Sequence, residues 1–208
     1  VGQIGGPALS VAVQGHYVYV GFCTTFAVLD MTNPTQPRRI GYLLMYASEI
    51  AVQGEYAYVG GKLGLSIVAI GDPTHPITLG FIATEPVTGL AISDDQVYLI
   101  DREGGLSIID VAQPADPVRI GFWQMSSRAE DITVADHYAY LDTLDGLQIV
   151  DVATPPHPVV VGFFPHQPFS QAIAKVNQTV YLATQGGLLI VDVTAPAAPT
   201  EVGLVDLP

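Results

Sequence analysis

A proline-containing cassette recurs five times along this chain. One copy reads GLQIVDVATPPHPVVVGFF, from Gly146 to Phe164: an apolar run, an aspartate, two prolines three residues apart, and a second apolar run closed by a glycine. The closing glycines, separated by 39, 41, 41 and 41 residues, are Gly41, Gly80, Gly121, Gly162 and Gly203. Self-similarity at a fixed period of about 20–50 residues is the signature of a repeat architecture. The chain is therefore expected to fold as an array of five similar units.

Each unit is predicted to form four β-strands. In the first unit, Val11–Val13 ends at a Gln14–Gly15 turn, and Tyr17–Val20, Phe26–Asp30 and Arg39–Leu44 follow as three further strands. The paired prolines interrupt pairing between the third and fourth strands, because proline has no N–H for the ladder. A tyrosine of the second strand recurs with the same step, at Tyr19, Tyr58, Tyr98, Tyr140 and Tyr181.

The third strands are apolar on both faces. In LQIVDV, Leu147 and Ile149 point to one side while Val150 and Val152 point to the other. A sheet buried on both faces must lie between other layers. Four-stranded sheets repeating about every 41 residues predict an all-β fold of the β-propeller class, for which about 40–45 residues per blade is typical. A linear β-solenoid is the alternative, but its coils are usually shorter.

The unit AEDITVADHYAYLDTLDGLQIVDVATPPHPVVVGFF, residues 129–164, resembles the LVIVD-repeat propeller family, and the resemblance extends over essentially the whole chain in five copies. It implies a propeller that usually occurs in exported or surface proteins of bacteria and archaea, and it implies no particular reaction. We expect one propeller domain over residues 1–208, with repeats at about 7–44, 45–83, 84–124, 125–164 and 165–205.

The two ends of the sequence leave the number of blades open. VGQIGG at residues 1–6 matches a fourth strand and is surplus to the five units, while EVGLVDLP at the C-terminus is also a fourth strand. The favoured prediction is five blades of four antiparallel strands, with the terminal strands competing for or sharing the closing edge. The alternative is a fragment of a larger propeller or array, whose exposed edge would invite self-association.

Composition narrows the classes of partner. The net charge is −13, from 7 basic and 20 acidic side chains, so a nucleic-acid partner is not expected. No run of 18 apolar residues exists, so no membrane span is predicted. No signal peptide appears in this segment, and the family resemblance implies an extracellular or cell-surface location.

Several conspicuous residues are predicted to be structural. The aspartate of the cassette ends a strand and can accept backbone N–H groups to fix the proline turn; it occurs as Asp30, Asp110, Asp151 and Asp192. In the second unit Ala69 replaces it, which predicts a less firmly held turn. The five histidines lack the spacing of metal ligands, and Cys23 has no histidine near it in the sequence. No metal site, cofactor or catalytic residue is therefore predicted.

The residues before each first strand are the candidate binding site. They differ between units while the strands repeat, as expected of a functional face on a repeating scaffold, and in propellers they line the mouth of the central channel. The predicted binding residues are Tyr46, Glu49, Arg128, Glu130, Asp131 and Phe169. They combine a carboxylate cluster, an arginine counter-ion and two aromatic surfaces.

Three functions fit these features. The favoured one is a non-catalytic scaffold or a module that binds a protein or glycan ligand at the channel mouth or loop face. A glycan-processing enzyme is the second, with Glu49, Glu130 and Asp131 as acid and base, which would need two carboxyls about 5–10 Å apart. The third is a lectin with repeated shallow pockets between blades, which aromatic side chains at equivalent positions would support.

Overall fold

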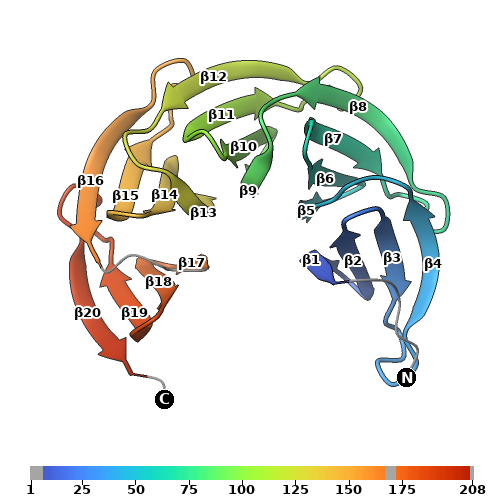
Figure 1. Ribbon diagram of the computed structural model, residues 1–208, viewed down its shortest axis with the longest axis horizontal. Coiled ribbons are helices and arrows are strands. Elements are labelled where there is room, and N and C mark those ends of the chain that lie inside the picture. The colour runs from blue at the N-terminus through green and yellow to red at the C-terminus, as the bar shows by residue number, and fades with distance from the viewer. Residues whose placement is uncertain (1–6, 167–171, 207–208) are drawn as a thin grey trace. The chain divides into compact units, whose positions relative to one another are not determined.

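The structure, a computed structural model, describes residues 7–166 and 172–206. Within these residues the chain forms five four-stranded antiparallel sheets, and in each sheet the strands lie in the order of the sequence (Figure 1). The predicted strand at residues 1–6 lies outside the described residues. None of the described residues belongs to an apolar helix of membrane-spanning length.

The strands of the five sheets have the following bounds. Sheet 1 comprises β1 (Ala8–Gln14), β2 (Tyr17–Phe22), β3 (Phe26–Asp30) and β4 (Arg38–Leu43). Sheet 2 comprises β5 (Glu49–Gln53), β6 (Tyr56–Gly60), β7 (Gly64–Ala69) and β8 (Ile77–Ala83). Sheet 3 comprises β9 (Val87–Ser93), β10 (Gln96–Asp101), β11 (Gly105–Asp110) and β12 (Val118–Gln124). Sheet 4 comprises β13 (Ala129–Ala135), β14 (Tyr138–Thr143), β15 (Gly146–Asp151) and β16 (Val159–Pro165). Sheet 5 comprises β17 (Ile173–Val176), β18 (Thr179–Thr184), β19 (Gly187–Asp192) and β20 (Thr200–Val205).

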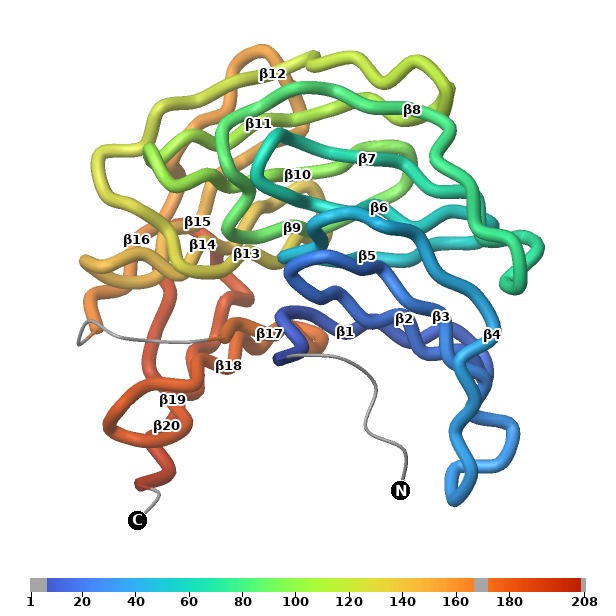
Figure 2. The backbone as a smooth tube through the Cα atoms, turned by 45° about the vertical axis from the view of Figure 1, so that its right-hand side comes forward, coloured from blue at the N-terminus to red at the C-terminus, as the bar shows by residue number. Residues whose placement is uncertain are grey.

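The sheets are distributed over two compact units, which are described separately. The first contains Val1–Val97 and Asp110–Val118, and the second contains Tyr98–Ile109 and Arg119–Pro208. In the first unit β5 lies beside β1 on one side and β9 on the other, as the tube in Figure 2 shows for β1 and β5. In the second unit β13 lies beside β17. Within each unit, the first strands of successive sheets are thus neighbours.

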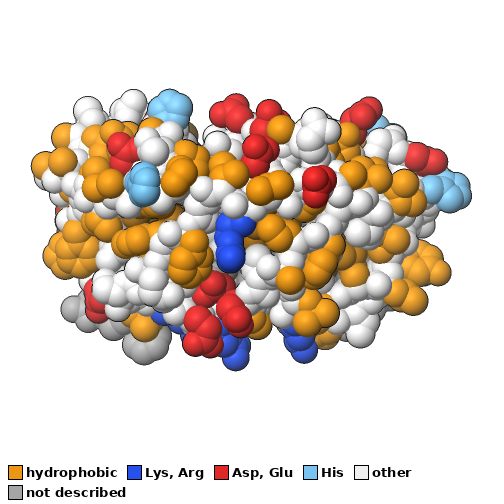
Figure 3. All heavy atoms as spheres, turned by 90° about the horizontal axis from the view of Figure 1, so that it is seen from above, with side chains coloured by type: hydrophobic (Ala, Val, Ile, Leu, Met, Phe, Trp, Pro, Cys, Tyr) orange, Lys and Arg blue, Asp and Glu red, His pale blue; other side chains and the backbone are white. Residues whose placement is uncertain are grey.

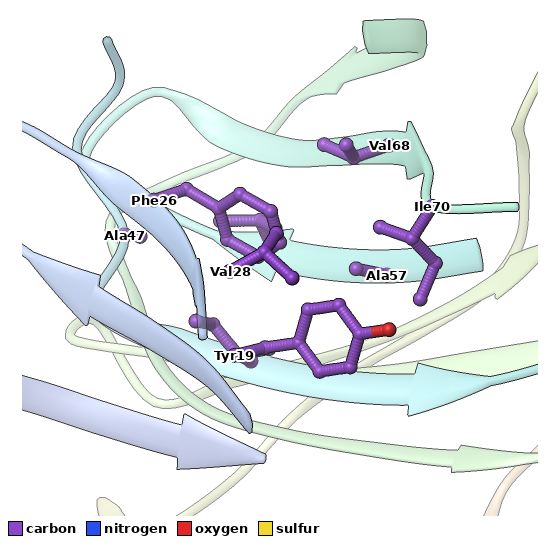
Figure 4. Close-up of a cluster of buried hydrophobic side chains, with 9 residues drawn as sticks. Tyr19, Phe26, Val28, Ala47, Ala57, Val68 and Ile70 are labelled. Atoms are coloured by element: carbon purple, nitrogen blue, oxygen red, sulfur yellow. The ribbon is translucent and has the colours of Figure 1, made fainter. Parts of the chain in front are cut away.

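Adjacent sheets bury an apolar layer between them. In the first unit, Tyr19 and Phe26 of sheet 1 stack with ring centroids 6.1 Å apart and meet Ala57 and Val68 of sheet 2 (Figure 4). Phe26, Ala57 and Val68 are fully buried. This packing explains why the third strands are apolar on both faces, since each side of an inner sheet meets another sheet.

The closing glycine of each cassette fits against the proline turn of the next sheet. A β-bulge directly precedes this glycine in sheets 1, 2, 4 and 5 and re-aims the strand. At Gly162 an added Cβ would overlap the carbonyl oxygen of Pro196, and equivalent overlaps occur for Gly41 with Pro73, Gly80 with Pro114 and Gly121 with Pro155. Glycine is needed here because any side chain would collide with backbone.

The cassette aspartates act as predicted. Asp30 Oδ1 accepts the Thr32 N–H at 2.9 Å, and the same bond forms at Asp110, Asp151 and Asp192. Hydrogen bonds from the side chain and backbone of Thr194 hold the pKa of Asp192 below its ordinary value. The second turn lacks this bond, because Ala69 has no carboxylate, but a bond of the same kind forms three residues later, where Asp72 Oδ1 accepts the Thr74 N–H at 2.9 Å.

Candidate functional site

The predicted site residues fall in both compact units. Tyr46 precedes β5 and Glu49 begins it, both in the first unit. Arg128 precedes β13, and Glu130 and Asp131 lie on that strand in the second unit. Phe169 lies outside the described residues. The channel mouth, to which both units would contribute, stays a prediction.

Asp131 connects sheet 4 to sheet 5. Its Oδ1 accepts the Ile132 N–H at 2.8 Å and its Oδ2 accepts the Ile173 N–H at 3.0 Å. In the first unit Ser10 occupies the equivalent position, and its Oγ accepts the Ile50 N–H at 3.0 Å. Burial raises the pKa of the Asp131 carboxyl despite these two bonds. In both units, the side chain at this repeat position accepts a backbone N–H from the first strand of the next sheet. Because serine does this in the first unit, the bond does not require a carboxylate.

Replacing Asp131 with serine should keep the hydrogen bond to the Ile173 N–H of sheet 5 and remove the buried charge. We expect the free energy of unfolding at pH 7 to stay within about 1 kcal/mol of the original, whereas Asp131→Ala should lose about 1–3 kcal/mol by leaving the Ile173 N–H unpaired. A raised folded-state pKa means that the wild type becomes less stable as pH rises from the ordinary value of 3.8 through the folded pKa. Asp131→Ser should therefore flatten that part of the stability profile. Urea unfolding at a series of pH values measures this, and an unchanged profile would contradict it.

Arg128 and Glu130 form an ion pair beside Asp131. Arg128 Nη2 lies 3.2 Å from Glu130 Oε2, and the two side chains are 40% and 31% exposed. Partly exposed pairs of this kind contribute little stability. Arg128 was predicted to be the counter-ion of the carboxylates Glu49, Glu130 and Asp131. It forms an ion pair with Glu130, whose charge it neutralises.

A buried histidine–aspartate pair, which sequence reasoning missed, lies in the same unit. His166 Nε2 is 3.1 Å from Asp142 Oδ1, with side chains only 3% and 1% exposed. Among the described residues, neither oxygen of Asp142 accepts a hydrogen bond of good geometry. The His166–Asp142 contact is therefore electrostatic, and it is an ion pair when the imidazole is protonated.

The signal for this pair was a departure from the repeat. Asp142 occupies a position that holds small or apolar residues in the other units: Gly21, Gly60, Ile100 and Ala183. His166 follows its closing glycine by four residues, where two other units have Met45 and Met125. Asp142 and His166 are thus two polar residues at repeat positions where other units have nonpolar ones, and both lie where sheet 4 leads into sheet 5.

A pocket of about 440 Å³ lies in the first unit, between the link after β4 and the β6–β7 hairpin. Its lining includes Met45, Tyr46, Lys62, Leu63, Ser66 and Phe81. The ammonium of Lys62 lies 4.6 Å from the centroid of the Tyr46 ring, a cation–π contact. Leu63 is 75% exposed and Phe81 is 51% exposed, so the rim presents apolar surface. We call this the Tyr46 pocket.

A second pocket, of about 410 Å³, occupies the equivalent place between sheets 4 and 5. Its lining includes Phe164, His166, Thr184, Leu189, Glu201 and Leu204. His166 stands where the Tyr46 pocket has Met45, and Leu204 stands where it has Phe81. The two pockets therefore share a position in the repeat but differ in chemistry, since the aromatic Phe81 is not repeated.

The two carboxylates of the glycan-hydrolysis hypothesis that lie in the second unit, Glu130 and Asp131, already have partners. Both oxygens of Asp131 accept backbone N–H groups, and Glu130 is paired with Arg128. Glu49, the third predicted carboxylate, belongs to the first unit. Among the described residues, no three His, Cys, Asp or Glu side chains gather as metal ligands.

The sequence matches the model of the LVIVD repeat at residues 5–43, 46–84, 87–123, 127–164 and 178–207. The five matches cover well over half of the chain, so the chain belongs to the LVIVD-repeat family. A search of curated proteins finds no match.

Solved structures of propeller proteins share the fold. The WD40 domain of Pan2 from Neurospora crassa has a TM-score of 0.76 at 12% identity, with 96% of this chain and 66% of that chain covered. The computationally designed Ika8 protein gives 0.73 at 16% identity, with 94% and 60% covered. BamB from Moraxella catarrhalis gives 0.64 at 15% identity, with 89% and 58% covered. The chain thus spans about three fifths to two thirds of these structures, and its fold is a β-propeller array.

Proposed function

We propose that this chain is a non-catalytic binding module of an exported or cell-surface protein, and that its ligand is a protein segment held in the Tyr46 pocket. The observation that supports this proposal is the pocket. Its volume is about 440 Å³, its lining is mainly apolar, and it holds one ammonium group, that of Lys62, beside the Tyr46 ring. Binding pockets are typically about 300–1,000 Å³, mostly apolar, with a few polar groups that fix orientation.

The positive charge of Lys62 indicates that the ligand carries a negative group. Lys62 is one of only two lysines in a chain of net charge −13, and basic side chains are sparse on the face shown in Figure 3. A ligand that places an apolar side chain against Phe81 and a carboxylate near Lys62 would match both features of the lining. A peptide segment with an apolar residue next to an acidic one has this chemistry.

A protein ligand is favoured over a glycan by the small number of polar groups in the pocket. Sugar hydroxyls need several hydrogen-bonding partners, and the lining offers mainly Lys62 and Ser66 beside its backbone groups. A repeated lectin site would need an aromatic at the equivalent position of the second pocket, where Leu204 replaces Phe81. The aromatic ring of that pocket, Phe164, comes from a repeat position that holds Leu43 in the first unit. The enzyme alternative loses support because Asp131 is engaged by two backbone amides and Glu130 by Arg128.

A peptide selection tests the proposal. The chain is immobilised and used to select from a displayed random peptide library, while a glycan array and a glycan-release assay are run in parallel. We expect selected peptides to share an apolar residue adjacent to an aspartate or glutamate. Selection of no common peptide, combined with binding to glycans or glycan release, would contradict the proposal.

Tyr46→Ala and Lys62→Gln should each weaken the binding of a selected peptide at least about tenfold, which corresponds to ~1.4 kcal/mol. Tyr46 supplies the ring that orders the ammonium, and Lys62 supplies the charge that meets the ligand's carboxylate. The matched control is Arg39→Gln, because Arg39 also lies over a tyrosine ring, 5.3 Å from the centroid of Tyr42, outside this pocket. Titration calorimetry should show unchanged affinity for the control, and equal losses in all three variants would count against the pocket.

A further inference from the structure

The pocket of about 410 Å³ between sheets 4 and 5 differs in charge from the Tyr46 pocket. Where the Tyr46 pocket has the ammonium of Lys62, this pocket has the carboxylate of Glu201 on β20. The Glu201 side chain is exposed, and the ion pairs among the described residues do not include it. We call this the Glu201 pocket.

The opening of the Glu201 pocket does not depend on its place in the last sheet. It lies between β16, with the link that follows β16, and sheet 5, and all of these residues belong to the second unit. The same place in the repeat is open between sheets 1 and 2. Leu204, which lines the pocket, occupies a repeat position whose side chains are 45–55% exposed in every sheet: Tyr42, Phe81, Phe122, Phe163 and Leu204.

The interior of the Glu201 pocket is apolar apart from one imidazole. Leu189 is 6% exposed, and Phe164 packs against the apolar layer between sheets 4 and 5. The buried imidazole of His166 lines the pocket and contacts Asp142. When His166 is protonated, Asp142 balances its charge. Glu201 therefore gives the pocket its net negative charge.

The repeat indicates which cation fits this place. Glu201 lies two residues before its closing glycine, where sheets 1 and 3 have arginine. The guanidinium of Arg39 lies 5.3 Å from the centroid of the Tyr42 ring, and that of Arg119 lies 5.6 Å from the centroid of the Phe122 ring. In sheet 5 the charge at this position is reversed. A guanidinium at this place in sheet 5 would therefore have to come from a ligand.

We propose that the Glu201 pocket binds an arginine side chain of a partner protein. The planar guanidinium pairs with the carboxylate of Glu201, which its fork of N–H groups fits. The aliphatic stem of the arginine and an adjacent apolar residue pack against Leu189 and Leu204. Arginine is preferred to lysine because a guanidinium is more weakly hydrated and stacks on an aromatic ring, here that of Phe164.

The proposal goes beyond the binding of an acidic segment in the Tyr46 pocket and does not rest on it. The two pockets lie between different pairs of sheets and carry opposite charges. The net charge of −13 attracts a basic segment toward the chain as a whole. The experiment therefore has to separate binding in the Glu201 pocket from this general attraction.

A peptide selection on the Lys62→Gln variant tests the Glu201 pocket by itself. Peptides recovered from a displayed random library should share an arginine beside an apolar residue. Titration calorimetry should show that Glu201→Gln weakens their binding at least about tenfold, and that replacing the arginine of the peptide with lysine weakens it too. Glu201→Gln should leave the melting temperature unchanged, because the side chain is exposed. Acidic peptides selected on the wild type should bind Glu201→Gln as tightly as they bind the wild type.

Glu55→Gln is the matched control, because it removes the same charge from an exposed glutamate in the β5–β6 turn, outside the pocket. It should leave the binding of arginine peptides unchanged. Equal weakening by Glu55→Gln and Glu201→Gln would overturn the proposal, since it would show a general attraction to the acidic surface. Recovery of no arginine-containing family, or equal binding of the lysine peptide, would overturn it too. Failure of the Tyr46 proposal would appear instead as the absence of acidic peptides from the wild-type selection.

Discussion

Gly162→Ala is expected to lower the free energy of unfolding by about 3 kcal/mol, which is the upper part of the usual range for overpacking. The added Cβ would overlap the carbonyl oxygen of Pro196, and a backbone group cannot move aside as a flexible side chain can. For a chain of this length the melting temperature should fall by about 6–12 °C. Thermal unfolding followed by circular dichroism measures the change.

Gly203→Ala is the matched control for this prediction. It changes the same residue type at the same repeat position, but its Cβ would meet no atom within 4 Å. Its melting temperature, measured at a concentration where the chain is monomeric, should stay close to that of the wild type. Equal losses for Gly162→Ala and Gly203→Ala would show that backbone preference, and not the contact with the next proline turn, determines the cost.

The second large effect is expected at the buried His166–Asp142 pair. His166→Met introduces the residue found at this position in two other units, but it leaves Asp142 buried without its charge partner. Removing one partner of a buried ion pair typically costs about 3–5 kcal/mol. Asp142→Ala, which copies Ala183, should cost less, because a neutral imidazole remains.

The double variant His166→Met with Asp142→Ala should recover most of this loss. Replacing both members of a buried pair by apolar residues is often neutral or stabilising. The coupling free energy from a double-mutant cycle in urea should therefore be large, well above the few tenths of a kcal/mol seen for independent sites. Met45→Leu, in the link after β4, controls for loss of methionine packing at the equivalent position. Additive effects of the two substitutions would contradict a direct interaction between these side chains.

The repeat was sufficient to predict the strands and their packing. The alternation in Val11–Val13, the double-faced third strands and the proline turn each follow from local chemistry that recurs in every unit. The observed strand β3 (Phe26–Asp30) has the predicted bounds, whereas β1 (Ala8–Gln14) extends beyond the predicted Val11–Val13 at both ends. The bulge before each closing glycine was not predicted, because it depends on how the fourth strand meets the next proline turn.

The candidate site was less predictable, because its contacts join residues that are distant in sequence. Tyr46 was predicted as a binding residue, but its partner Lys62 comes from the β6–β7 hairpin and shares no motif with it. Asp131 was predicted for the same site, yet a backbone amide 42 residues later engages it. His166 and Asp142 break the repeat pattern, and that break was the available sequence signal for their contact.

The position at which a peptide binds the chain decides whether the Tyr46 pocket is the binding site. Isotope-labelled chain is titrated with a selected peptide while backbone amide chemical shifts are recorded by NMR. We expect the largest shifts to centre on Tyr46, Lys62 and Phe81. In Lys62→Gln they should require at least about tenfold more peptide, whereas Arg39→Gln should titrate as the wild type does. Shifts centred instead on Glu130 and Asp131, with the Tyr46 pocket unaffected, would contradict this expectation.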